Sequence, residues 1–137
     1  MTEPVYLVDT SVAIPLVVTG HEAHDLVTDS LDDKRLGLAG HAWFESFSVL
    51  TRLPPPARRS PADVVAILGH NFPASRFLDP DKSKTVIDTL VALGVSGGSV
   101  YDALVGYTAV AHGLPLVTRD DRALKLYRAL GASVTIL

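Results

Sequence analysis

Short apolar runs alternate with helix-like segments along this chain, and this alternation limits the folds that are open to it. Val5–Val8 is continuously apolar and precedes helix-starting residues, which is typical of a buried strand in a parallel sheet. We expect further strands at 36–39, 76–78, 116–118 and 134–137. Because parallel strands need crossover connections, the order predicts an α/β fold, a three-layer α/β/α sandwich with a central parallel sheet. Residues 1–137 are expected to form a single domain.

Helices are expected between these strands, at 11–18, 21–31, 41–53, 81–93, 100–112 and 122–130, with a break near Thr19 and Gly20. One more helix is predicted to start after Ser60, which has the character of an N-cap, with Pro61 at the first helical position and Asp63 three residues after the cap. It is expected to end near His70. The proline-rich connector at 54–59 that precedes it cannot lie inside a helix.

Composition favours a cytoplasmic protein without membrane partners. No apolar run approaches the roughly 18 residues that span a bilayer, and residues 1–4 lack the features of a signal peptide. The chain has no cysteine, which excludes disulfides and thiolate metal sites. The net charge is −3, yet residues 1–33 hold seven of the fifteen acids and none of the twelve Lys and Arg residues. The overall acidity therefore neither supports nor excludes nucleic acid as a substrate.

Four acids end or interrupt apolar stretches: Asp9, Glu45, Asp102 and Asp120. Asp9 and Asp120 follow expected strands, and Asp102 stands at the head of a helix of small residues. Ligands of an open parallel sheet bind outside the carboxyl ends of its strands. A carboxylate near a core is unfavourable unless it is paired or binds a cation. The four acids together therefore predict one metal site.

Helix capping is the alternative explanation for two of these acids. Asp9 taken alone fits equally well as the N-cap of a helix that begins at Thr10. Ser99 and Asp102 have the spacing of a capping box, with Asp in the place of the commoner Glu or Gln. For each acid taken alone, the structural and the functional interpretation are about equally supported.

Two neighbouring acids compete for the fourth position. If Thr118 is the N-cap of the last helix, Asp121 occupies the third helical position and takes the capping-box role. Asp120 is then free to point into the site. We therefore predict Asp120 as the fourth acid and keep Asp121 as the alternative.

Glu45 fits a structural role least well. No Lys or Arg lies three or four residues away to form a helical ion pair, and its aromatic neighbours Phe44 and Phe47 imply that it is at least partly buried. A buried carboxylate without a partner is strongly disfavoured. A role in ligand binding is therefore the better hypothesis for Glu45.

Hydroxyl side chains adjoin two of the acids and are expected to form a second layer around the site. These are Thr10, Ser11 and Thr118, which can hold carboxylates or a bound water in place. An all-oxygen ligand set selects Mg²⁺ or Mn²⁺ over zinc. His21 and His24 are one residue short of the zinc-protease HExxH spacing, so we expect a solvated helical face there.

With these residues in place, the chain resembles the PIN-domain ribonucleases, and among them the VapC toxins of bacterial and archaeal toxin–antitoxin pairs. The matching segments are YLVDTS at 6–11, Glu45 with VLTRL at 49–53, YDAL at 101–104 with the small-residue helix that leads to GLPL at 113–116, and VTRDDRA at 117–123. The proline segment and residues 60–62 are also similar. Four such motifs in the family's order cover nearly the whole chain, which makes the resemblance specific.

The resemblance implies a function and a set of site residues. Asp9, Glu45, Asp102 and Asp120 would be the catalytic quartet that binds Mg²⁺ or Mn²⁺. Family members are endoribonucleases that hydrolyse RNA, are usually dimeric, and are held inactive by a cognate antitoxin. The expected partners are therefore an RNA substrate, a VapB-like antitoxin, a second copy of the chain in a homodimer, and a toxin–antitoxin hetero-oligomer.

Four basic residues on the last expected helix are candidates for contacts with RNA backbone phosphates, namely Arg119, Arg122, Lys125 and Arg128. A solvated helical face is the alternative for all four. Two other functions remain as rivals. One is a degenerate PIN fold that binds RNA or a partner without cleavage. The other is a phosphatase of the haloacid dehalogenase type, which needs a second Asp where this chain has Ser11.

Overall fold

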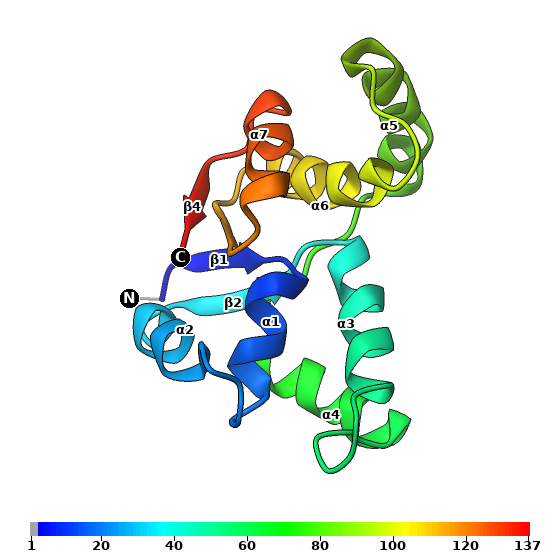
Figure 1. Ribbon diagram of the computed structural model, residues 1–137. Helices are drawn as coiled ribbons and strands as arrows, with labels where there is room; N and C mark the ends of the chain where they lie inside the picture. Colours follow the sequence, from blue (N-terminus) through cyan, green and yellow to red (C-terminus); the bar gives the residue numbers. More distant parts are fainter. Residues whose placement is uncertain (1–2) are drawn as a thin grey trace.

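The computed structural model describes residues 3–137, and its elements follow the predicted alternation (Figure 1). In chain order the elements are β1 (Val5–Val8), α1 (Thr10–Val17), α2 (His24–Leu31), β2 (Arg35–Leu38), α3 (His41–Thr51), α4 (Pro61–Asn71), α5 (Pro80–Leu93), α6 (Ser99–His112), β3 (Leu116–Thr118), α7 (Asp121–Ala129) and β4 (Val134–Ile136). None of the helices within residues 3–137 combines the length and the apolar character that crossing a membrane would require.

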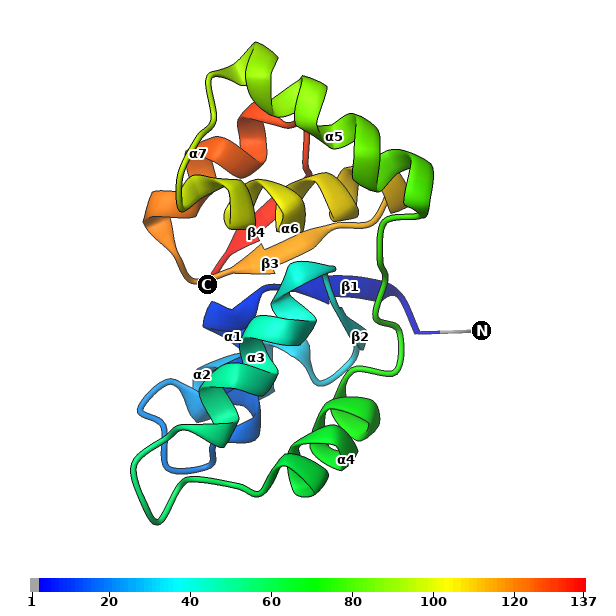
Figure 2. The same ribbon diagram turned by 90° about the vertical axis from the view of Figure 1, so that its right-hand side faces the viewer.

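The four strands form one parallel sheet in the order β2-β1-β3-β4. Figure 2 shows α5, α6 and α7 on one side of this sheet and α1, α2, α3 and α4 on the other. The predicted α/β fold with a central parallel sheet between helical layers is therefore confirmed. The two central strands carry the core, because Leu7, Val8, Leu116 and Val117 are at most 1 % exposed.

The strand order brings two distant segments together at one edge of the sheet. In an all-parallel sheet the carboxyl ends of the strands share an edge, and ligand sites form there. β1 and β3 are hydrogen-bonded neighbours, with Val8 opposite Val117. Asp9, which follows β1, and the segment that follows Thr118 at the end of β3 must therefore lie side by side.

The strand predicted at 76–78 is not formed. The chain instead pairs with β2 two residues earlier, where the Ala74 N–H donates to the Leu36 carbonyl and the Arg76 N–H to the Leu38 carbonyl. One parallel bridge joins Ala39 to Arg76, and the chain then turns away into α5. The apolar residues at 77 and 78 suggested a strand, but the contact with the sheet is too short for a ladder.

Several helix ends agree with the capping signals. Ser60 caps α4 by accepting a hydrogen bond from the Asp63 N–H, as predicted. Gly94, with a φ of 69°, ends α5 in the left-handed conformation that glycine adopts readily. The second helix begins later than predicted, at His24, because 18–23 form turns in which the His21 N–H donates to the Val18 carbonyl.

Candidate active site

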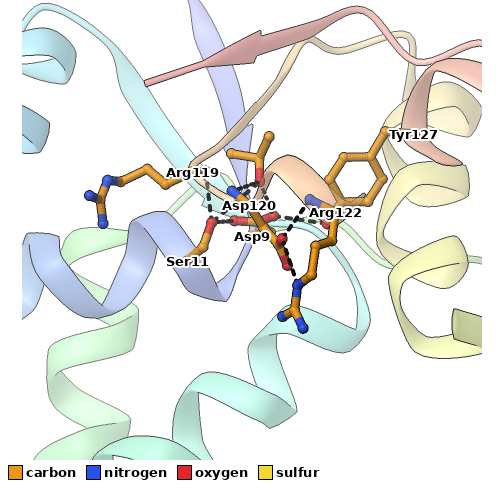
Figure 3. A network of polar contacts seen from close by, with 7 residues as sticks. Asp9, Ser11, Arg119, Asp120, Arg122 and Tyr127 are labelled. Atoms are coloured by element: carbon orange, nitrogen blue, oxygen red, sulfur yellow. Dashed lines mark hydrogen bonds and ion pairs between the residues drawn. The ribbon is translucent and has the colours of Figure 1, made fainter. Parts of the chain in front are cut away.

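Asp9 lies at the centre of a polar network at the carboxyl ends of β1 and β3 (Figure 3). The carboxylate is 5 % exposed and accepts three hydrogen bonds from hydroxyl groups. The Ser11 hydroxyl donates to Oδ1 at 2.5 Å, and the Thr118 and Tyr127 hydroxyls donate to Oδ2 at 2.6 and 2.8 Å. Asp9 occupies the N-cap position of α1, but its side chain makes no capping hydrogen bond. The capping explanation for Asp9 is therefore wrong.

The two short hydroxyl side chains connect Asp9 to the backbone that follows β3. The Ser11 oxygen accepts from the Arg119 N–H at 2.8 Å, and the Thr118 oxygen accepts from the Asp120 N–H at 3.0 Å. Each hydroxyl can donate only one proton, and the backbone donors direct both protons to Asp9. The carboxylate is therefore held in one orientation, which agrees with the expected supporting role of Ser11 and Thr118.

Burial raises the pKa of Asp9 above its usual value, because desolvation disfavours the charged form. The hydrogen bonds from Ser11, Thr118 and Tyr127 act in the opposite direction, and the charge of Asp120 adds to the rise. Burial also raises the pKa of Tyr127 far above its usual range, so its hydroxyl keeps its proton and remains a donor. The network is thus built to stabilise a carboxylate that burial disfavours.

All four predicted acids line one cavity of about 370 Å³. Asp9 precedes α1, Glu45 lies on α3, Asp102 is in the first turn of α6, and Asp120 follows β3. Thr10 and Ser11 line the same cavity, whereas Thr118 is fully buried beneath it. The structure therefore brings together side chains from four separate segments of the chain.

The carboxylates of Asp102 and Glu45 line the cavity, and no described residue donates a hydrogen bond to either of them. The capping box that was the alternative explanation for Asp102 is not formed, because Gly98 is the N-cap of α6 and no side chain caps that helix. Glu45 is exposed, so the prediction that it is at least partly buried was wrong. Its aromatic neighbours point to other sides of α3, and Phe44 is itself 62 % exposed.

The pKa of Asp102 is raised by partial burial and by the negative charges of Asp120, Glu45 and Asp9, while Arg122 opposes the rise. Like charges that share a site disfavour ionisation. The four acids therefore create a region of excess negative charge that the nearby side chains compensate only in part.

The last helix is capped differently from the prediction. Asp120, not Thr118, is the N-cap of α7, and its Oδ1 accepts from the Arg122 N–H at 2.9 Å. Thr118 lies in β3 with its hydroxyl committed to Asp9. Asp120 nevertheless lines the cavity, whereas Asp121 is exposed and does not. The predicted Thr118 cap was therefore wrong, although Asp120, the acid selected on that basis, lies at the cavity.

The four basic candidates separate into two groups. Arg119 lines the cavity, and Arg122 lies 3.5 Å from Asp120 with its side chain 93 % exposed. Lys125 and Arg128 are exposed on α7 and do not line the cavity. Figure 3 shows Arg119 and Arg122 extending to different sides of Asp9 and Asp120.

Two polar residues that line the cavity were missed by sequence reasoning. Tyr127 is four residues after Ala123 on the buried face of α7, and this periodic burial was the available signal that its hydroxyl needs a buried acceptor. His21 lines the cavity, and the Nδ1 atom of His24 lies 2.8 Å from the Pro15 carbonyl. The prediction of a solvated helical face for the two histidines was therefore wrong.

The donor set of the cavity suits a hard divalent cation. Carboxylate oxygens are the ligands that Mg²⁺ and Mn²⁺ prefer. Within residues 3–137, however, no three His, Asp or Glu side chains stand together in an arrangement that would hold an ion. The acids would therefore have to move closer together to share an ion. Asp102 and Glu45 have free lone pairs for this, and an ion would relieve the repulsion among the four acids.

The chain is similar in sequence to proteins of known name. Residues 6–129 match the PIN domain family. Ribonuclease VapC27 of Mycobacterium tuberculosis is 40 % identical over 134 residues, which cover 98 % of each chain. Ribonuclease VapC40 of the same species is 41 % identical over 131 residues, covering 94 % of this chain and 96 % of that protein.

Solved structures with low sequence identity share the fold. One is the crystal structure of VapBC2 from Rickettsia felis bound to a DNA fragment from their promoter, with a TM-score of 0.68, 12 % identity, and coverage of 97 % of this chain and 98 % of that chain. PAE2754 from Pyrobaculum aerophilum has a TM-score of 0.58 and 24 % identity, with coverage of 96 % and 90 %. These similarities concern the arrangement of the helices and strands.

Proposed function

Because this chain belongs to the PIN-domain family and is a homologue of VapC ribonucleases, we propose that it is a metal-dependent endoribonuclease and the toxin of a toxin–antitoxin pair. Its proposed catalytic and metal-binding residues are Asp9, Glu45, Asp102 and Asp120. Residues 1–137 would form one nuclease domain. The observation that carries the proposal is that these four acids, from four separate segments, line one cavity.

The residues of the site would have separate roles. Ser11, Thr118 and Tyr127 fix the orientation of the Asp9 carboxylate, and their hydrogen bonds favour its ionised form against the effect of burial. Asp102, Glu45 and Asp120 supply further oxygen atoms at the cavity wall. Mg²⁺ or Mn²⁺ bound by these acids would supply Lewis-acid activation of water and stabilise negative charge on the phosphate.

The proposed reaction is hydrolysis of an RNA phosphodiester bond. A water oxygen forms a new bond to phosphorus, and the bond between phosphorus and the 3′ oxygen breaks. One proton of the water ends on the leaving oxygen. The products are a 3′-hydroxyl and a 5′-phosphate, because the bond to the 3′ oxygen breaks, and no cyclic phosphate forms, because the nucleophile is water and not the ribose 2′-hydroxyl.

The test is cleavage of total RNA by the purified chain in Mg²⁺, in Mn²⁺ and in excess chelator. We expect cleavage that chelator abolishes and that added Mg²⁺ or Mn²⁺ restores. Asp9→Asn and Asp102→Asn should reduce cleavage to background, while Asp121→Asn serves as the matched control on an exposed neighbour. Because all variants are purified in the same way, they also control for contaminating ribonucleases. Cleavage by the wild type that persists in chelator would rule out the metal-dependent mechanism.

We propose further that a VapB-like antitoxin neutralises the chain and that the chain forms a homodimer within a toxin–antitoxin hetero-oligomer. The similarity to a chain of the VapBC2 structure supports a partner of this kind. Expression of the wild type alone should stop growth of the host cell, and expression with the antitoxin from the same operon should restore it. If Asp102→Asn stops growth as strongly as the wild type, toxicity does not come from RNA cleavage.

A further inference from the structure

We propose that His21 and Arg119 form a phosphate-binding subsite beside the four acids, which holds an RNA backbone phosphate next to the one that is cleaved. The inference rests on the proposed ribonuclease function and adds to it the way in which the substrate is held. Both residues line the same cavity as the acids, yet neither takes part in the network around Asp9 through its side chain.

The Arg119 side chain has hydrogen-bonding capacity that the protein does not use. Its Nε atom is buried and has no hydrogen-bond partner. None of the ion pairs within residues 3–137 includes Arg119, although four carboxylates line the same cavity. A buried donor without an acceptor is unfavourable, so an acceptor supplied by a ligand would stabilise this arrangement.

The backbone of Arg119 is fixed while its side chain is left free. The Ser11 hydroxyl accepts from the Arg119 N–H at 2.8 Å, which places the start of this side chain against the Asp9 network. In Figure 3 the guanidinium group then extends away from Asp9, on a different side from Arg122. Arg122 lies 3.5 Å from Asp120 and partly neutralises it, so the two arginines have different electrostatic surroundings.

His21 offers a second donor whose position is set by the backbone. The Ala23 N–H donates to Nδ1 of His21 at 3.0 Å, so Nδ1 carries no proton. In a neutral imidazole the other nitrogen must then carry the proton, which makes Nε2 a donor. In this tautomer Nε2 has no free lone pair, so His21 can donate to an acceptor but cannot bind a metal ion.

A phosphate group matches these two donors. Phosphate oxygens are acceptors only, carry negative charge, and suit the planar fork of an arginine. The acids that would cleave RNA lie in the same cavity, so a strand that crosses it presents neighbouring phosphates to the acids and to the donors. The acids would hold the metal and the reacting phosphate, and the donors would fix the register of the strand.

The test compares substitutions that separate the roles of each side chain. His21→Asn keeps an acceptor near the position of Nδ1 and removes the distal donor, whereas His21→Gln keeps a distal donor and removes that acceptor. Arg119→Gln removes the charge. Arg35→Gln is the matched control, because Arg35 is exposed at the amino end of β2, away from the carboxyl-end edge that carries Asp9.

The measurement is the affinity of a short single-stranded RNA for each variant in the cleavage-deficient Asp102→Asn background, at several salt concentrations. We expect Arg119→Gln to weaken binding about tenfold and to lower the slope of log K against log salt by about 0.7, the value for one phosphate contact on a single strand. His21→Asn should weaken binding more than His21→Gln does and leave the slope unchanged, since the neutral imidazole carries no charge. Arg35→Gln should bind as the background does.

In the cleavage-competent chain the same substitutions should raise KM more than they lower kcat, because they remove binding at a phosphate that does not react. If Arg119→Gln and His21→Asn bind RNA as tightly as Arg35→Gln while the wild type cleaves RNA, the subsite is wrong and the ribonuclease function stands. If the wild type neither binds nor cleaves RNA, both the phosphate subsite and the ribonuclease function are wrong. The variants could also bind RNA with unchanged affinity and escape inhibition by the antitoxin. That result would show that the two donors bind the antitoxin and would overturn the proposal.

Discussion

Replacing Tyr127 with Phe tests how far the Tyr127 hydroxyl favours the ionised form of the buried Asp9 carboxylate. Tyr127 is 1 % exposed, and its hydroxyl donates to Asp9 Oδ2 at 2.8 Å. The substitution removes one of the three hydroxyl donors and leaves the aromatic ring in place. A hydrogen bond to a charged group contributes about 1.5–3 kcal/mol to stability. We therefore expect Tyr127→Phe to lower the free energy of unfolding by about 1.5–3 kcal/mol at pH 7 in the absence of divalent metal.

The pH dependence of this loss distinguishes a bond to the carboxylate from a packing effect. The folded-state pKa of Asp9 is already raised by burial, and removal of a donor to the ionised form raises it further. A raised carboxyl pKa means that stability falls as the pH rises from the unfolded value, about 3.9, through the folded value. The fall should be larger in Tyr127→Phe. Below both values Asp9 is protonated, and the loss should shrink to that of a neutral hydrogen bond, about 0.5–1.5 kcal/mol.

The assay is urea unfolding followed by circular dichroism at neutral and acidic pH in chelator, with Tyr107→Phe as the control. Tyr107 is partly buried on α6, and its hydroxyl makes no hydrogen bond within residues 3–137. Tyr107→Phe should change stability by less than about 0.5 kcal/mol. Equal losses of stability in the two variants at pH 7, or a loss in Tyr127→Phe that grows as the pH falls, would contradict a hydrogen bond to the ionised carboxylate.

Three further predictions concern charge, packing and the choice between neighbouring acids. Because the pKa of Asp102 is raised, Asp102→Asn should stabilise the metal-free protein at pH 7 by about 0.5 kcal/mol after allowance for solvent screening, and it should weaken the stabilisation by added Mg²⁺. Thermal unfolding with and without Mg²⁺ measures both effects. A Tm of Asp102→Asn below that of the wild type in chelator would show that repulsion among the acids does not destabilise the protein. A Cβ at Gly37 would clash with the backbone carbonyl of Ala74, so Gly37→Ala should lower the free energy of unfolding by about 3 kcal/mol or more. An unchanged urea midpoint would show that the backbones at Gly37 and Ala74 are not in close contact. Asp120→Asn should impair RNA cleavage far more than Asp121→Asn, since only Asp120 lines the cavity; equal rates for the two variants would remove Asp120 from the site.

Much of the fold could be predicted from the sequence, because its signals are local. The apolar run of β1 and the Ser60 cap each depend on residues a few positions apart. The failed strand at 76–78 shows the limit of such signals. A strand exists only if a neighbouring strand offers a ladder long enough to pair with, and β2 pairs with this segment only as far as Arg76.

The four acids that line the candidate site could be predicted from the sequence, but some of the residues that surround them could not. Asp9, Asp102 and Asp120 were selected because acids beside apolar segments are unfavourable without a role, and that argument needs no coordinates. The same argument misjudged Glu45, whose exposure depends on which side of α3 faces the neighbouring helices. The burial of a single side chain depends on how whole helices and strands pack. Its neighbours in sequence do not predict this packing.

The sequence by itself determined most of the segments that become strands and helices and which acids stand at their ends, since those properties follow from residues close together in sequence. Only the tertiary structure decided that Tyr127 donates to Asp9 across 118 positions, that Asp120 caps α7 while lining the cavity, and that His21 shares this cavity. These contacts depend on how the crossover helices stack on the sheet. The stacking is set by the packing of many side chains at once, and no short stretch of sequence encodes it.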